Sequence, residues 1–134
     1  MLTLVAYNHP ILRSQSKSVE YFDSSLRDLI GDMKQYIVHR GGKVCGLAAP
    51  QVGIAEQIFV ARLFDGKQYG FPRVFINPII LKTIGFCPSY EGCLSIPDQL
   101  YLWRPWRIGI EYRDEWGIQH TLERTLHKSP HSLV

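Results

Sequence analysis

A single cysteine with an unusual setting is the first candidate for chemistry in this chain. Cys93 stands in the string EGCLS, where Gly92 permits a close backbone turn and Leu94 offers an N–H beside the thiol. A thiolate there would be a metal ligand or a nucleophile. A lone cysteine is otherwise a small buried apolar residue, so the string alone leaves both interpretations open.

The second candidate is Gln51, in the string GLAAPQVG at residues 46–53. Small side chains allow a backbone to approach a ligand closely, and a glutamine amide donates hydrogen bonds to a developing oxyanion. The alternative is a tight loop that leads into a strand, with the Gln51 amide in solvent.

Two histidines near the end of the chain, His127 and His131, lie four residues apart in the string HKSPH. One interpretation is a distorted metal site that these histidines form with Cys93. The other is a polar tail with accidental spacing, because Pro130 opposes a helical turn through both histidines.

Composition sets the class of protein. The 134 residues suffice for one domain, and 46% hydrophobic with 20% charged residues is ordinary for a globular protein. The net charge is +3 without a run of five basic residues, which argues against DNA as a partner. No apolar run approaches the roughly 18 residues of a membrane helix. Three cysteines without an export signal favour free thiols or metal ligation over disulfides, and the cytoplasm as the location.

The elements that must position these residues follow from periodicity. Residues 22–42 predict a helix that Asp23, Ser24 or Ser25 caps and that Gly41 and Gly42 end. Strands are predicted over 56–64, over 73–82 with an interruption at Pro78, and over 106–117 with a return strand over 118–126. One helix followed by mostly antiparallel strands indicates the α+β class.

Together the two strings are far more specific than either alone. GLAAPQVG, followed some forty residues later by EGCLSIP, resembles the peptide deformylase family. The strings HPILR, DLIGDM, FINPII and EYRDEWG lie where that family would place them. The resemblance covers residues 1–122 as one domain and leaves residues 123–134 as a divergent C-terminal tail.

The resemblance implies a small α+β domain whose strands surround a metal-binding helix. In the family a divalent ion, iron in the cell and often zinc or nickel in preparations, activates a water that attacks the formyl group of an N-terminal formyl-methionine. Carried over, Cys93 is a metal ligand, while Gln51 and the Leu94 N–H stabilise the oxyanion.

Substrate contacts are also implied by the resemblance. The flank formed by Val44, Cys45 and Gly46 would pair with the extended peptide backbone, and Glu91 and Gly92 would lie beside the peptide. Val44 is a departure, because family members usually carry glycine at that position. Nascent formyl-methionyl peptides are the expected partners, with the ribosome nearby and no membrane.

The match is incomplete at the C-terminal end. The family takes two further ligands and its general base from an H-E-x-x-H helix, and this sequence contains no such string. His127 and His131 keep the spacing, but Lys128 replaces the glutamate, so the central helix is truncated or altered. Its loss would uncover apolar faces of the strands and of the helix over 26–37, which a homodimer would cover.

Three hypotheses therefore stand. The chain is a metal-dependent deformylase with activity impaired by the missing motif, a deformylase-fold peptide-binding protein without catalysis, or a non-functional remnant that folds poorly.

Overall fold

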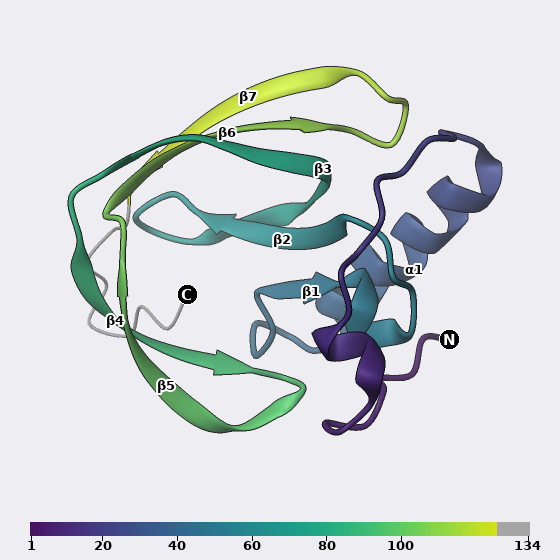
Figure 1. Cartoon of the computed structure of the whole chain (residues 1–134), viewed down its shortest axis with the longest axis horizontal. Helices are drawn as coiled ribbons and strands as arrows, with labels where there is room; N and C mark the ends of the chain where they lie inside the picture. Colours follow the sequence, from purple (N-terminus) through teal and green to yellow (C-terminus); the bar gives the residue numbers. More distant parts are fainter. Residues whose placement is uncertain (126–134) are drawn as a thin grey trace.

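A computed structural model describes residues 1–125 of the chain. Within these residues the fold has one α-helix, two short 3-10 helices and seven strands (Figure 1). In chain order the elements are η1 (Pro10–Arg13), α1 (Ser24–His39), β1 (Gly46–Ala48), η2 (Ala49–Val52), β2 (Ile58–Phe64), β3 (Tyr69–Ile84), β4 (Cys87–Cys93), β5 (Ile96–Arg104), β6 (Arg107–Arg113) and β7 (Gln119–Thr125). The α+β class is confirmed.

The predicted helix is confirmed as α1. The Asp23 carboxylate caps it by accepting the Leu26 N–H at 2.9 Å, and the chain leaves the helix through Gly41 in a left-handed conformation. The buried face of α1 has the helical spacing expected from sequence: Leu26, Ile30, Met33 and Ile37.

Five antiparallel strands form one sheet in the order β1-β2-β3-β6-β7. The long strand β3 pairs with β2 along its first half and with β6 along its second half. The predicted interruption at Pro78 appears as a bulge in the pairing, with a register shift between Ile76 and Ile79, while the strand β3 itself continues through the proline. The Asn77 side chain stabilises this bulge by bonding the backbone N–H and C=O of Val19 at 2.8 and 2.9 Å.

Two apolar clusters lie on opposite faces of this sheet. The first packs α1 against residues of β1, β2 and β3, including Leu47, Val60 and Ile76. The second centres on Phe75, which stacks on Phe59 with ring centroids 4.7 Å apart and meets Tyr112 at 4.5 Å. We call α1 and the five-stranded sheet the body of the molecule.

Strands β4 and β5 form a separate two-stranded sheet, which we call the hairpin. Sequence patterns did not predict these strands. Gly85 makes the corner between β3 and β4 in a left-handed conformation, and the Trp106 ring lies so close that no side chain would fit there. Tyr90 and Tyr101 pair edge to face across the hairpin at 4.8 Å.

The expected exposure of apolar faces is confirmed for the strands and wrong for the helix. All four apolar residues on the inner face of α1 are at most 7% exposed, because the sheet covers them. Large exposed apolar side chains instead gather on the second half of β3 and on the hairpin: Ile79, Ile80, Leu81, Ile84, Tyr90, Ile96, Leu100, Tyr101 and Trp103.

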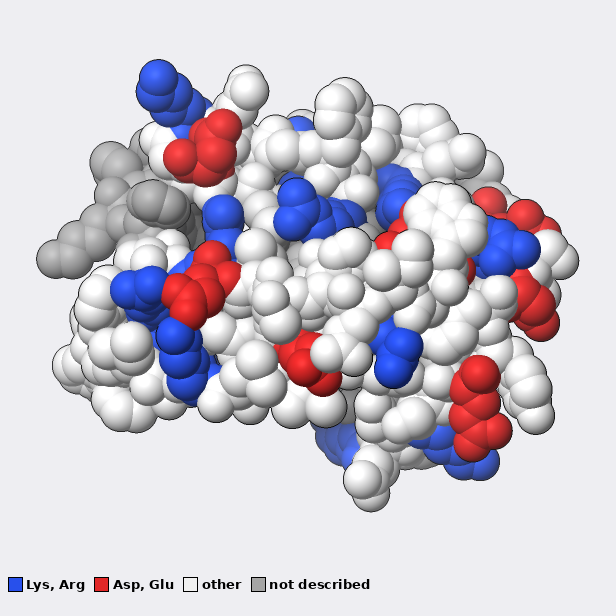
Figure 2. Space-filling view, turned by 90° about the horizontal axis from the view of Figure 1, so that it is seen from above, with Lys and Arg blue, Asp and Glu red and all other residues white. Residues whose placement is uncertain are grey.

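The C-terminal end of the described chain is a strand. β7 runs through Thr125, so the proposed boundary between residues 122 and 123 falls inside it. The rest of the tail, including His127 and His131, lies outside the described residues. Over the described residues on the face seen in Figure 2, Lys and Arg are interspersed with Asp and Glu and form no broad basic surface. Within residues 1–125 no helix has the length and hydropathy needed to cross a membrane.

Candidate active site

Gln51 is held by the turn that follows β1. The chain passes from β1 directly into η2, where Ala49 is fully buried, and the Val5 N–H bonds the Gln51 carbonyl at 2.9 Å. The Gln51 Oε1 accepts the Ala48 N–H at 2.8 Å. Because that backbone group can only donate, Oε1 must face it, and the amide nitrogen Nε2 is directed the other way.

Cys93 lies at the end of β4, where the two-residue turn of Leu94 and Ser95 leads into β5. The thiol is exposed, whereas Ser95 is only 8% exposed. Within residues 1–125 the Leu94 N–H donates to no acceptor. The turn therefore presents a thiol and a backbone donor side by side.

The two strings singled out from the sequence meet at this turn. Gln51 Nε2 lies 3.6 Å from Cys93 Sγ and donates to Ser95 Oγ at 3.2 Å. Gln51 thus shares one site with two residues that follow it by 42 and 44 positions in the sequence. The sequence pattern did not single out Ser95 for a role, although its hydroxyl two positions after the cysteine was visible in EGCLS.

Glu91 is engaged within the hairpin. Both of its carboxylate oxygens accept from the Arg104 guanidinium, at 2.7 and 2.6 Å, across the β4–β5 pair. These hydrogen bonds from Arg104 hold the pKa of the Glu91 carboxyl below its usual value, against a smaller opposing effect of burial. The Glu91 side chain thus stabilises the hairpin that carries Cys93.

The strand β1 has one open edge. The Arg62 N–H bonds the Cys45 carbonyl at 2.7 Å, so the facing pair Gly46 and Ala61 is a non-hydrogen-bonded pair of the antiparallel ladder. The backbone groups of Leu47 consequently face β2, and those of Gly46 point away from it. Val44, by contrast, is 4% exposed and packs in the first apolar cluster.

Gly92 has no structural need to be glycine within the described chain. Its backbone is outside the left-handed region, and a Cβ built there would meet nothing within 4 Å. The absence of a side chain therefore leaves open space immediately before Cys93.

A divalent metal would need more ligands than the described residues supply. No group of three His, Cys, Asp or Glu within residues 1–125 is placed to hold an ion. His9 accepts the Ile11 N–H at the start of η1, and His120 pairs with Asp114 at 2.7 Å. Cys45 and Cys87 are half-buried free thiols. The described donor set is thus Cys93 alone, and the further expected ligands, His127 and His131, lie outside it.

Comparison with known proteins agrees with this arrangement. The family model described as polypeptide deformylase matches residues 1–128. The chain is 40% identical to a peptide deformylase of Borreliella burgdorferi, over 92% of this chain and 73% of that protein. It is 38% identical to one of Chlorobaculum parvum, over 92% of this chain but only 66% of that protein. The crystal structure of peptide deformylase from Thermotoga maritima superposes with a TM-score of 0.82 at 35% identity, covering 93% of this chain and 82% of that one. The chain therefore belongs to the peptide deformylase family.

Proposed function

We propose that this chain binds the formyl-methionine end of a peptide and removes the formyl group in a reaction that depends on a divalent metal. The observation that carries the proposal is the convergence of Gln51, Cys93 and the Leu94 N–H at one turn. Two donors beside a thiol suit a reaction in which negative charge develops on a carbonyl oxygen.

The chain's own residues have distinct tasks in this proposal. Gly46, at the open edge of β1, pairs with the extended peptide backbone as an added strand would. The open space at Gly92 admits the peptide close to Cys93. Gln51, whose Oε1 is held by the Ala48 N–H, then donates to the oxygen of the formyl group in place of its long hydrogen bond to Cys93 Sγ.

The proposal includes a divalent metal, although the described residues supply only one of the expected ligands, Cys93. Iron, zinc or nickel would be held by Cys93 together with His127 and His131. The chemistry that such an ion supplies when bound is Lewis-acid polarisation and a lowered pKa of water.

A second candidate function is peptide binding without catalysis. The observation that favours it is the engagement of carboxylates, which could otherwise act as a general base, in ion pairs. Glu91 is bound by Arg104, Glu115 by Lys34, and Glu123 by Lys82 and Arg107. Each of these carboxylates is engaged in an ion pair, which leaves it poorly suited to accept a proton at Cys93.

One experiment separates the two functions. The purified chain, loaded with Fe²⁺, Zn²⁺ or Ni²⁺ in turn, is tested for formate release from a formyl-methionyl tripeptide and for binding of that peptide by calorimetry. Turnover supports the deformylase, and binding without turnover supports the peptide-binding protein. The absence of both binding and turnover supports a non-functional remnant. Metal content should fall in Cys93→Ala and not in the control Cys87→Ala, whose half-buried thiol lies at the far end of β4.

The remaining expectations concern the setting of the protein. Nascent chains at the ribosome in the cytoplasm would supply the substrate. A homodimer over the exposed apolar strands would show as a concentration-dependent sedimentation coefficient.

A further inference from the structure

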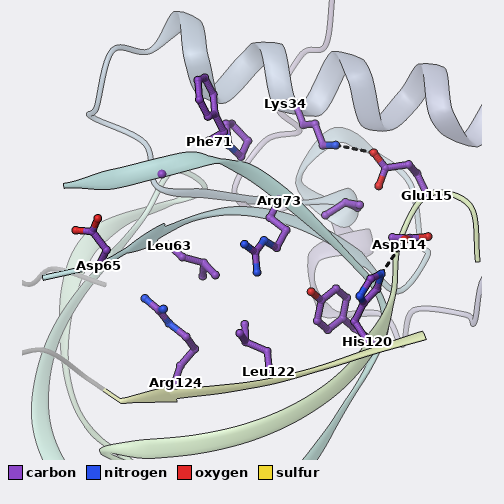
Figure 3. A pocket seen from close by; sticks show the side chains of 14 residues that line it. Lys34, Leu63, Asp65, Phe71, Arg73, Asp114, Glu115, His120, Leu122 and Arg124 are labelled. Carbon is purple, nitrogen blue, oxygen red and sulfur yellow. Dashed lines mark hydrogen bonds and ion pairs between the residues drawn. The ribbon is translucent and has the colours of Figure 1, made fainter. Parts of the chain in front are cut away.

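A cavity of about 840 Å³ lies between the start of β3, the end of β2 and β7, with α1 above it (Figure 3). It shares no residue with the turn at Cys93. Its lining combines cationic, acidic and apolar side chains, among them Arg73, Arg124, Asp65, Leu63 and Leu122.

The acidic groups of this cavity are already engaged within the protein. Asp65 accepts two backbone N–H groups of its own turn, at 2.8 and 2.9 Å. Asp114 pairs with His120 at 2.7 Å, and Glu115 with Lys34 at 2.8 Å. Each of these carboxylates therefore already has a hydrogen-bond partner within the protein, and the charge of Glu115 is offset by Lys34.

The two arginines of the cavity are less completely engaged. Within residues 1–125 the Arg73 guanidinium has no hydrogen bond and no ion pair, and Arg124 makes one hydrogen bond, to the Phe64 carbonyl. Figure 3 shows both side chains extending into the cavity, Arg73 from β3 and Arg124 from β7. The cavity thus retains unused donors that carry positive charge.

Apolar side chains lie beside these donors. Leu63 and Leu122 approach the arginines from β2 and β7 (Figure 3), and both belong to the second apolar cluster. Phe71, at the rim, is 94% exposed. An apolar group bound there would cover surface that water now contacts.

We propose that this cavity binds a small carboxylate that carries a short apolar chain. A guanidinium matches a carboxylate in a two-pronged geometry, and the cavity volume is within the range of small-molecule sites. The carboxylate meets Arg73 and Arg124, and the chain lies against Leu63 and Leu122. This assignment is independent of the proposed deformylation, because it uses none of the same residues.

Octanoate is the test ligand, titrated into the ¹⁵N-labelled full chain and followed through the backbone amide signals of Leu63, Gly70 and Leu122. We expect saturable shifts of these signals. Octanamide, which has the same chain without the charge, and inorganic phosphate, which has charge without the chain, should each bind at least about fivefold more weakly. Equal binding of octanamide or of phosphate, or no shift of the cavity signals with octanoate, overturns the proposal.

Arg73→Gln is the decisive variant, because within residues 1–125 the Arg73 side chain makes no hydrogen bond or ion pair and the substitution leaves its strand backbone in place. Octanoate should bind it about fivefold more weakly, with Arg73→Lys between the two. Arg40→Gln is the matched control, since Arg40 ends α1 over the Tyr36 ring, outside the cavity, and should leave the affinity unchanged. Unchanged affinity in Arg73→Gln contradicts the assignment whatever the result for deformylation.

Discussion

The body and the hairpin of this protein are built in different ways. In the body, α1 and the five-stranded sheet bury two apolar clusters, and residues such as Met33 and Ile76 have no exposed surface. In the hairpin, Tyr101 and Trp103 are more than half exposed, and the specific side-chain contacts within it are one ion pair, one serine–glutamate hydrogen bond and one pair of aromatic rings. Burial therefore stabilises the body, while backbone pairing and a few polar contacts hold the hairpin.

This difference matters because the candidate site spans both regions. Gln51 belongs to the body, and Cys93 with Ser95 belongs to the hairpin. The hydrogen bonds from the Gln51 amide join the two regions at the site. We infer that the rigid half of the site positions the donor and that the hairpin brings the thiol to it.

The largest effect is expected from truncating the centre of the body. Phe75→Ala removes a ring that is 1% exposed and packed between two others, which should lower the free energy of unfolding by about 3–5 kcal/mol. Trp103→Ala in the hairpin, where the ring is 65% exposed, should change it by less than about 0.5 kcal/mol. Urea unfolding measures both, and similar losses would refute the contrast between the regions.

The next largest effect is expected on turnover, from removing the Gln51 amide, which the body holds at the candidate site. If the metal-loaded chain is active, Gln51→Ala should lower kcat about 10²–10³-fold with little change in KM, because the amide serves the developing oxyanion. Steady-state kinetics with a formyl-methionyl tripeptide measure this. An unchanged kcat would mean that Gln51 only shapes the turn after β1.

A smaller effect is expected at the junction between the regions. Ser95→Ala leaves one Gln51 amide hydrogen without its acceptor in a partly buried position, and should cost about 1 kcal/mol of stability. Faster hydrogen exchange should follow in the hairpin and not in α1. Equal acceleration in both regions would show that the hairpin is not separately held.

The smallest effect is a pH dependence of the hairpin. Because Arg104 lowers the pKa of Glu91 below its ordinary value of 4.5, their pairing stabilises the fold above that pH. The contribution disappears as the pH falls through the lowered pKa. Glu91→Gln should therefore cost about 0.5 kcal/mol of stability near neutral pH, since solvent partly screens the pair, and nothing once the pH lies below the lowered pKa. If Glu91→Gln lowers the free energy of unfolding by the same amount at every pH, Glu91 contributes through packing and not through its charge.

Local patterns predicted the parts of the fold that depend on local physics. The cap at Asp23, the spacing of the buried face of α1 and the turn ending at Gly117 all appear in the structure. Patterns failed at the hairpin, where apolar side chains lie on exposed positions and do not alternate with polar ones. At Pro78 the pattern located the break in pairing, but it did not show that the strand continues beyond it, which depends on the bonds of the Asn77 side chain to Val19.

The sequence by itself singled out Gln51 and Cys93 as the candidates for chemistry, because they and their small neighbours stand in two strings that together resemble one family. Only the tertiary structure decided that they meet, that Ser95 joins them, and that the Glu91 carboxylate is bound by Arg104. It also revealed the cavity with Arg73 and Arg124, which are 51 positions apart in sequence. The physical reason is that each of these contacts depends on how β3 bends and where the hairpin docks, and both are set by packing between distant segments.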